Sequence, residues 1–90
     1  MEEWNKVKKE LLRDKEAYRE YKKLEPKYRL ISQLIGARIK KGLTQRQLAE
    51  KVGTKQSAIA RIESGNANPS YDFLEKITSA LGSKLIVQIK

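Results

Sequence analysis

The sequence predicts a mainly α-helical protein: one small domain of short helices, preceded by a helical extension and followed by a short strand. Apolar residues recur every three or four positions through most of the 90 residues, which is the spacing of amphipathic helices. Glycine and hydroxyl residues interrupt this pattern where helices are expected to end and begin. The last eight positions include a short segment rich in β-branched residues, which predicts a strand.

Residues 1–26 form the predicted N-terminal extension. Trp4, Val7 and Leu11 recur at helical spacing. Asp14 is then expected to cap a second helical segment, so the pattern predicts two helical pieces broken once.

Residues 27–82 form the predicted core domain. Pro26 suits the first turn of a helix that runs to about Lys41 and ends at Gly42. The inward side of this helix carries a broad apolar stripe, which comprises Leu30, Ile31, Leu34, Ile35 and Ile39.

Two very short helices follow, separated by Val52-Gly53-Thr54. Thr44 with Gln47 three residues later predicts a capping box at the start of the first. Gly53 is expected to end it, and Thr54 to cap the second, which runs to about Glu63.

After a loop over residues 64–69, the sequence predicts a last helix from Tyr71 to Leu81. Ser70 is its expected cap, and Gly82 follows its end.

Residues 83–90 form the predicted C-terminal strand, with Leu85, Val87 and Ile89 on one face. A lone strand has unpaired backbone groups and is unstable by itself. We expect the same strand of a second copy to pair with it and form a homodimer. The edge of another protein's sheet and simple packing on the chain's own core are the alternatives.

The charge distribution favours a polyanionic partner. The net charge is +9, and residues 36–61 hold seven basic residues and one acid, or +6. A membrane partner is not expected, because no apolar run approaches about 18 residues and polar residues encircle the N-terminal helix. With neither Cys nor His, the sequence also predicts no enzyme, no metal and no cofactor. No signal peptide is visible, so a cytoplasmic location is the default expectation.

The second short helix has one apolar and one polar side. At about 100° per residue, Ala58, Ile59 and Ile62 face the core. The outward side comprises Gln56, Ser57, Ala60 and Arg61. Gln can pair with adenine, Arg with guanine, and a methyl group can touch thymine, so this side is predicted to read bases in a major groove. Phosphate contacts are expected from the neighbouring polar positions Gln45, Arg46, Thr54 and Lys55.

This stretch resembles the helix-turn-helix of the lambdoid-phage-repressor and Cro superfamily, often called the XRE family. The matching residues are Gln45, Leu48-Ala49, Gly53, Ile59 and Ile62, followed by Glu63-Ser64-Gly65. The resemblance implies a five-helix domain, dimeric binding to a double-stranded DNA operator, and Gln56, Ser57 and Arg61 as base readers. It also implies phosphate contacts near Asn66 and Asn68, and an ion pair between Arg38 and Glu63. Two separately solvated charges are the alternative to that pair.

With the N-terminal segment included, the chain is similar to HigA-type antitoxins. The similar positions are Leu11-Leu12, Asp14, Tyr21, Leu24-Glu25-Pro26, Tyr28, Gln33-Leu34-Ile35, Arg38, Asn68-Pro69-Ser70 and Phe73-Leu74. The sequence departs from the pattern at Lys15, where such proteins often carry Pro.

The antitoxin resemblance implies that the chain neutralises a RelE/HigB-like mRNA interferase toxin and represses its own operon. The apolar residues expected to dock that toxin are Trp4, Val7, Leu11, Tyr18 and Tyr21. These residues could instead pack on the chain's own helices. A stand-alone XRE-family repressor without a toxin is the alternative function.

Overall fold

The computed structural model describes residues 2–21 and 26–90, with side chains for 5–15 and 26–90. Within these residues the chain forms five helices: α1 (Glu2–Tyr21), α2 (Pro26–Lys40), α3 (Gln45–Val52), α4 (Gln56–Glu63) and α5 (Tyr71–Ala80). The prediction of a mainly helical protein is therefore confirmed. None of the helices in the described ranges is both long enough and apolar enough to cross a membrane.

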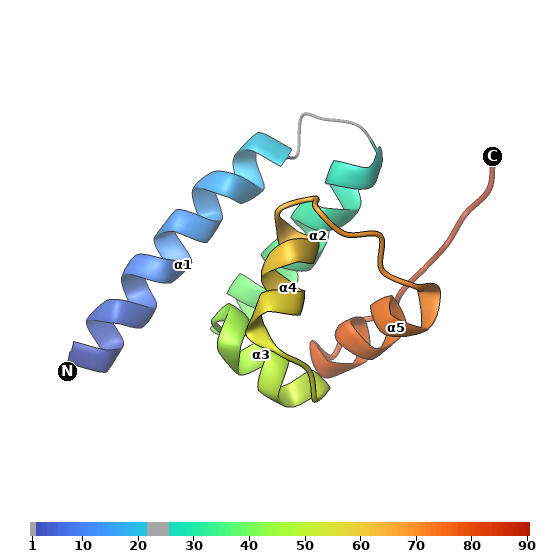
Figure 1. Ribbon diagram of the computed structural model, residues 1–90. Coiled ribbons are helices and arrows are strands. Elements are labelled where there is room, and N and C mark those ends of the chain that lie inside the picture. Colours follow the sequence, from blue (N-terminus) through green and yellow to red (C-terminus); the bar gives the residue numbers. More distant parts are fainter. Residues whose placement is uncertain (1, 22–25) are drawn as a thin grey trace.

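Helices α2 to α5 surround one small apolar core (Figure 1). Helix α3 packs against both α4 and α5, and α2 packs against α4. Seven buried residues make up the core: Leu34, Leu48, Ala49, Ile59, Ile62, Ile77 and Leu81. Because α4 is held from its inner side by these neighbours, its outer side is available to a partner.

Helix α1 is continuous, so the predicted break at Asp14 is wrong. The helix runs from Glu2 to Tyr21 without an interruption. No Gly or Pro occurs in this stretch to end a helix. Asp14 lies in the middle of α1 and its carboxylate contacts Arg38 instead of capping a second segment.

The link between α3 and α4 is a tight turn. The capping box at Thr44 is present, because its side chain accepts from the Gln47 N–H and the Gln47 side chain accepts from the Thr44 N–H. Gly53 ends α3 at φ 84°, a left-handed conformation that glycine adopts without strain.

Thr54 belongs to this turn and does not cap α4, contrary to the prediction. The N–H groups of Gly53 and Thr54 both donate to the Ala49 carbonyl, each at 2.9 Å. Helix α4 therefore begins one residue later than expected, with Lys55 at the N-cap and no side-chain cap bond.

The C-terminal strand predicted for residues 83–90 is not found. After α5, which Ser70 caps as predicted through the Phe73 N–H, the described chain continues as an extended tail that leaves the body of the molecule (Figure 1). The tail is not packed on the core either, because Ile86, Val87 and Ile89 are 80%, 65% and 95% exposed. Within the residues that the structure describes, it has no second strand with which to pair.

Candidate nucleic-acid interface

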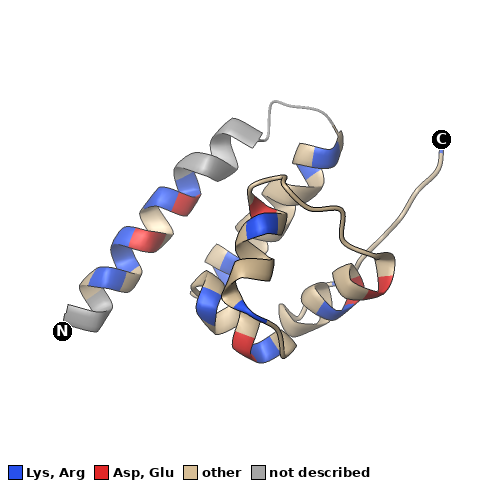
Figure 2. Cartoon of the chain, viewed as in Figure 1, with Lys and Arg blue, Asp and Glu red and all other residues tan. Residues whose placement is uncertain are grey.

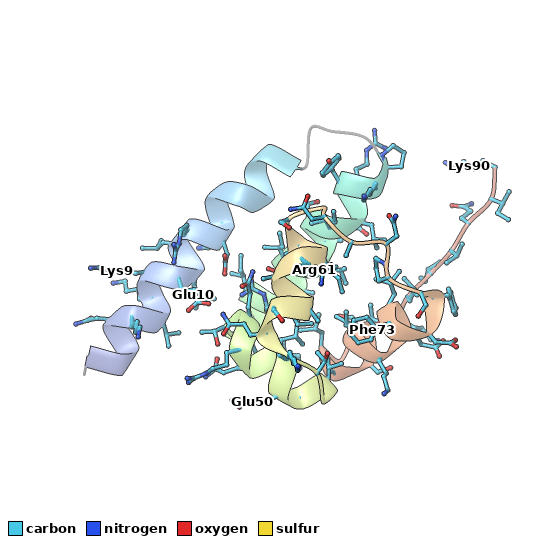
Figure 3. All side chains as sticks on the ribbon, viewed as in Figure 1. Lys9, Glu10, Glu50, Arg61, Phe73 and Lys90 are labelled. Carbon is cyan, nitrogen blue, oxygen red and sulfur yellow. The ribbon has the colours of Figure 1, made fainter. Side chains whose placement is uncertain are left out.

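The outer side of α4 carries the side chains that the sequence predicted to face a partner. Gln56, Ser57 and Arg61 are exposed and Ala60 is half-buried, whereas Ile59 and Ile62 of the same helix are almost fully buried. Arg61, labelled on α4 in Figure 3, lines an open hollow together with Asn68 and Phe73. An amide, a hydroxyl and a guanidinium therefore share one surface, with a methyl group between them, which is a set of groups suited to base edges.

The side chains predicted to contact phosphates are not equally accessible. Arg46, Lys55, Asn66 and Asn68 are exposed, and Thr54 is half-buried. Arg46 lies within 3.9 Å of Glu50 one turn further along α3, an exposed pair that leaves its guanidinium accessible.

Two of the predicted phosphate ligands are engaged within the protein. The half-buried side chain of Gln45 donates to Glu63 Oε1 at 3.0 Å through its Nε2. The Asn66 N–H donates to the Arg61 carbonyl at 3.0 Å, so this amide closes the end of α4.

A buried ionic cluster lies beneath the interface and comprises Asp14, Arg38 and Glu63. Arg38 is fully buried and donates to both carboxylate oxygens of Glu63 at 2.7 Å, through Nε and Nη2. Its Nη2 also donates to Asp14 Oδ2 at 2.7 Å, and its Nη1 donates to the Leu43 carbonyl at 2.9 Å. The predicted Arg38–Glu63 pair thus forms, and it acquires a third member from α1.

The ionic cluster keeps Arg38 charged. Burial by itself lowers the pKa of Arg38, but the hydrogen bonds and negative charges of Glu63 and Asp14 outweigh burial, so its pKa is raised above its ordinary value. A guanidinium enclosed by two carboxylates contributes little to the outer potential. The positive surface therefore comes from the exposed cations of α3 and α4, and Figure 2 shows them together with the mixed charges along α1.

Sequence reasoning missed the bonds that Asp14 and Gln45 make across the fold. Asp14 is 24 residues from Arg38, and Gln45 is 18 residues from Glu63. The one available signal is helical spacing, which places Asp14 on the same side of a continuous helix as Val7 and Leu11.

The residues predicted to dock a toxin are only partly described. Val7 and Leu11 are half-buried on α1, as the alternative of packing on the chain's own helices requires. The side chains of Trp4, Tyr18 and Tyr21 lie outside the described residues. The exposed large apolar residue in the described part of α1 is its neighbour Leu12, at 54%.

Across residues 5–15 and 26–90, no group of three or more His, Cys, Asp or Glu side chains could hold a metal ion.

The two short helices, the Gly53 turn and the exposed polar side of α4 define a helix-turn-helix domain of the kind found in DNA-binding transcriptional regulators. The Helix-turn-helix family model matches residues 34–87, more than half of the chain, and the chain belongs to this family.

Curated relatives share this domain. The chain is 43% identical over 58 residues to an uncharacterized HTH-type transcriptional regulator of Haemophilus influenzae, which covers 64% of the chain and 59% of the relative. It is 44% identical over 52 residues to multiprotein-bridging factor 1a of Arabidopsis thaliana, covering 58% of the chain and 37% of the relative. It is 51% identical over 45 residues to the human endothelial differentiation-related factor 1, covering 50% of the chain and 30% of the relative.

The chain thus spans from about a third to three-fifths of the length of these relatives. No solved structure matches the chain significantly.

Proposed function

We propose that this protein is a sequence-specific DNA-binding transcriptional repressor that inserts α4 into the major groove. The observation that carries this proposal is the exposure of Gln56, Ser57 and Arg61 on a helix whose other side is the core. Membership of the helix-turn-helix family supports it independently.

The chemistry of the interface divides its side chains into two roles. Gln56 and Arg61 are suited to bidentate contacts with adenine and guanine, and the small Ala60 lets the helix approach the bases closely. Lys55 and Arg46 lie at the N-terminal ends of α4 and α3, where a phosphate also meets the positive end of the helix dipole. In this proposal, Lys55 and Arg46 position the helix on the DNA backbone, and Gln56 and Arg61 select the base sequence.

Selection from a pool of random duplex DNA tests the proposal. Bound duplexes are amplified and sequenced through several rounds, and the affinity for the enriched sequence is compared with that for a scrambled duplex of equal length. We expect a preference of about a thousandfold or more, as specific DNA-binding proteins show. The absence of any enriched sequence would refute specific base reading.

Dimerisation through the tail is part of the proposal. Ile86, Val87 and Ile89 are among the most exposed large apolar residues of the described chain, and Leu85 beside them is half-buried. Leu85, Val87 and Ile89 alternate along the tail, so pairing with a second copy would satisfy the backbone groups and cover one apolar face.

An antitoxin role is the finer form of the proposal. It has three supports: the resemblance of the N-terminal segment to HigA-type antitoxins, the position of α1 outside the matched residues 34–87, and the exposed Leu12. The names of the plant and human relatives refer to protein bridging and differentiation, not to toxins. A stand-alone repressor is therefore the alternative.

Co-expression separates these two forms. The test first asks whether the gene has a neighbour that encodes a small RelE-like protein. If it does, this neighbour is expressed until growth stops, and the present protein is then induced. An antitoxin restores growth, and Leu12→Lys impairs the rescue whereas Lys8→Ala, an exposed change on the same helix, does not. Unchanged growth arrest with intact DNA binding would identify a stand-alone repressor.

A further inference from the structure

Helix α1 packs against α2 and faces the proposed DNA-binding end of the helix-turn-helix across an open hollow. Lys6, Val7 and Glu10 of α1 form one wall of an open hollow of about 410 Å³. The opposite wall comprises residues at the starts of α3 and α4: Thr44, Arg46, Gln47 and Gln56. One predicted base reader and one predicted phosphate ligand therefore face α1 across this space.

Within residues 5–15, both carboxylates of α1 lie on its inner side, and the cation Lys6 lines the same hollow. Glu10 and Asp14 lie on the inner side, where Glu10 is half-buried and the Asp14 side chain is 16% exposed. The other exposed cations of this stretch are Lys8, Lys9, Arg13 and Lys15. In Figure 3, Lys9 points away from the molecule and Glu10 lies on the side of α1 that faces the helix-turn-helix.

Glu10 lies where a phosphate at the start of α3 would be expected. The Thr44 side chain accepts from the Gln47 N–H, but Gln45 and Arg46 in the first turn of α3 have backbone N–H groups without an acceptor within the helix, and such groups attract anions. Glu10 stands across the hollow from that turn, and a DNA strand brought there would meet a negative side chain and the body of α1. The body of α1 thus opposes DNA sterically, and Glu10 adds a negative charge next to the exposed cation Lys6 on the same wall.

The buried ionic cluster holds α1 in this position. The Asp14–Arg38 bond of 2.7 Å joins α1 to the guanidinium that also binds Glu63. Glu63 in turn holds the Gln45 side chain at 3.0 Å, so the same cluster that anchors α1 also retains a predicted phosphate ligand.

We propose that α1 and duplex DNA compete for this surface, so that the structure is a closed form in which α1 restrains DNA binding and Asp14 is the latch. This proposal rests on the DNA-binding function proposed above. Only molecules in which α1 is released bind DNA tightly. The apparent affinity is therefore the intrinsic affinity multiplied by the released fraction.

Three full-length variants test the latch by titration with the selected duplex and with a scrambled one. Asp14→Asn weakens the bond to Arg38, which keeps both contacts with Glu63, and Glu10→Gln removes the facing charge without touching the buried cluster. Glu75→Gln is the matched control, because it changes the net charge equally at an exposed position on α5. We expect Asp14→Asn and Glu10→Gln to bind both duplexes about three- to tenfold more tightly than Glu75→Gln does.

The movement of α1 is measured directly in the same protein. The chain has no cysteine, so spin labels at Lys9→Cys on α1 and Lys76→Cys on α5 are the only ones present. We expect their distance distribution to lengthen or broaden when saturating DNA is added.

Each outcome decides the proposal. The latch is overturned, and the DNA-binding function stands, if two results occur together. Asp14→Asn and Glu10→Gln bind DNA with the affinity of Glu75→Gln, and the distance between the labels does not change when DNA binds. Weaker binding by Asp14→Asn with an unchanged distance also overturns it and makes α1 an additional DNA contact. Failure of all the variants to bind any duplex overturns both the latch and the proposed function.

Discussion

Arg61 and Lys55 are both exposed cations of the α4 region, but their positions differ, and the proposed function gives them different roles. Arg61 projects from the side of the helix that also holds Gln56 and Ser57, whereas Lys55 precedes the first turn. A charge at a helix end meets the DNA backbone, and a charge on the groove-facing side meets base edges. This distinction can be measured.

Replacing a base-reading side chain should change specificity. Gln56→Ala or Arg61→Ala is expected to lower the affinity for the selected duplex by about 1–3 kcal/mol and to relax base choice at one position. Titrations against a set of single-base variants of the duplex measure this. Equal losses on selected and scrambled DNA would contradict base reading.

Removing the charge of Lys55 should act on all sequences alike. Lys55→Ala is expected to weaken binding to every duplex and to reduce the slope of log affinity against log salt by about one unit. Affinities measured at several salt concentrations give this slope. Lys76→Ala on α5 is the control, since the same charge is lost there away from α4. If both variants give the parental slope, Lys55 does not contact a phosphate.

Gly65 is expected to be the least replaceable glycine. It has φ +82°, and an added Cβ would lie 2.9 Å from Tyr28 Cε1, closer than such contacts normally come. Gly42 has a similar φ of +71° but no atom within 4 Å of such a Cβ. Gly42→Ala should therefore lower the free energy of unfolding by about 1–2 kcal/mol through the backbone alone, and Gly65→Ala by more. Urea unfolding of both variants measures the difference, and equal losses would exclude a contribution from Tyr28.

At the scale of elements, the ionic cluster joins three helices through one guanidinium. Arg38 is on α2, Asp14 on α1 and Glu63 at the end of α4. Removing one partner leaves a buried charge without its counter-ion, which is more damaging than the loss of an exposed pair.

Glu63→Ala should consequently lower the free energy of unfolding by about 3–5 kcal/mol. Glu50→Ala is the control, because Glu50 is 71% exposed and lies 3.9 Å from Arg46, so its loss should cost about 0.5 kcal/mol or less. Denaturant titrations compare the two proteins. Similar small losses would mean that α1 and α4 do not depend on the cluster for their attachment.

The same elements show how far the sequence could predict the structure. The capping box at Thr44, the left-handed Gly53 and the buried side of α4 depend on residues a few positions apart, and all three were predicted correctly. The contact of Asp14 with Arg38 depends on how α1 folds back, which spacing along the chain does not encode. The predicted cap of α4 is wrong because the Thr54 N–H donates to the Ala49 carbonyl, which holds Thr54 in the turn. Residue preferences alone do not show whether such a residue joins the turn or caps the next helix.

On the scale of the whole molecule, the two ends of the described chain lie on opposite sides of the body (Figure 1). Helix α1 flanks the predicted DNA-facing end on one side, and the exposed tail leaves from the other. A dimer formed through the tails would therefore leave α1 of each copy beside its own α4. Two α4 helices could then read two half-sites, whose spacing is set by the dimer.

Truncation after Ser83 should weaken dimerisation and, through it, operator binding, because two linked half-sites are bound far more tightly than one. Sedimentation of the full chain and the truncated chain over a range of concentrations measures the association.

Two point variants test the same face without shortening the chain. Ile89→Lys and Gln88→Lys add the same charge, but only Ile89→Lys alters the face formed by Leu85, Val87 and Ile89. We expect Ile89→Lys to shift the equilibrium toward monomer and Gln88→Lys to leave it nearly unchanged. A truncated chain that still sediments as a dimer would place the interface on the helical body, and the exposed tail would then have to serve another partner.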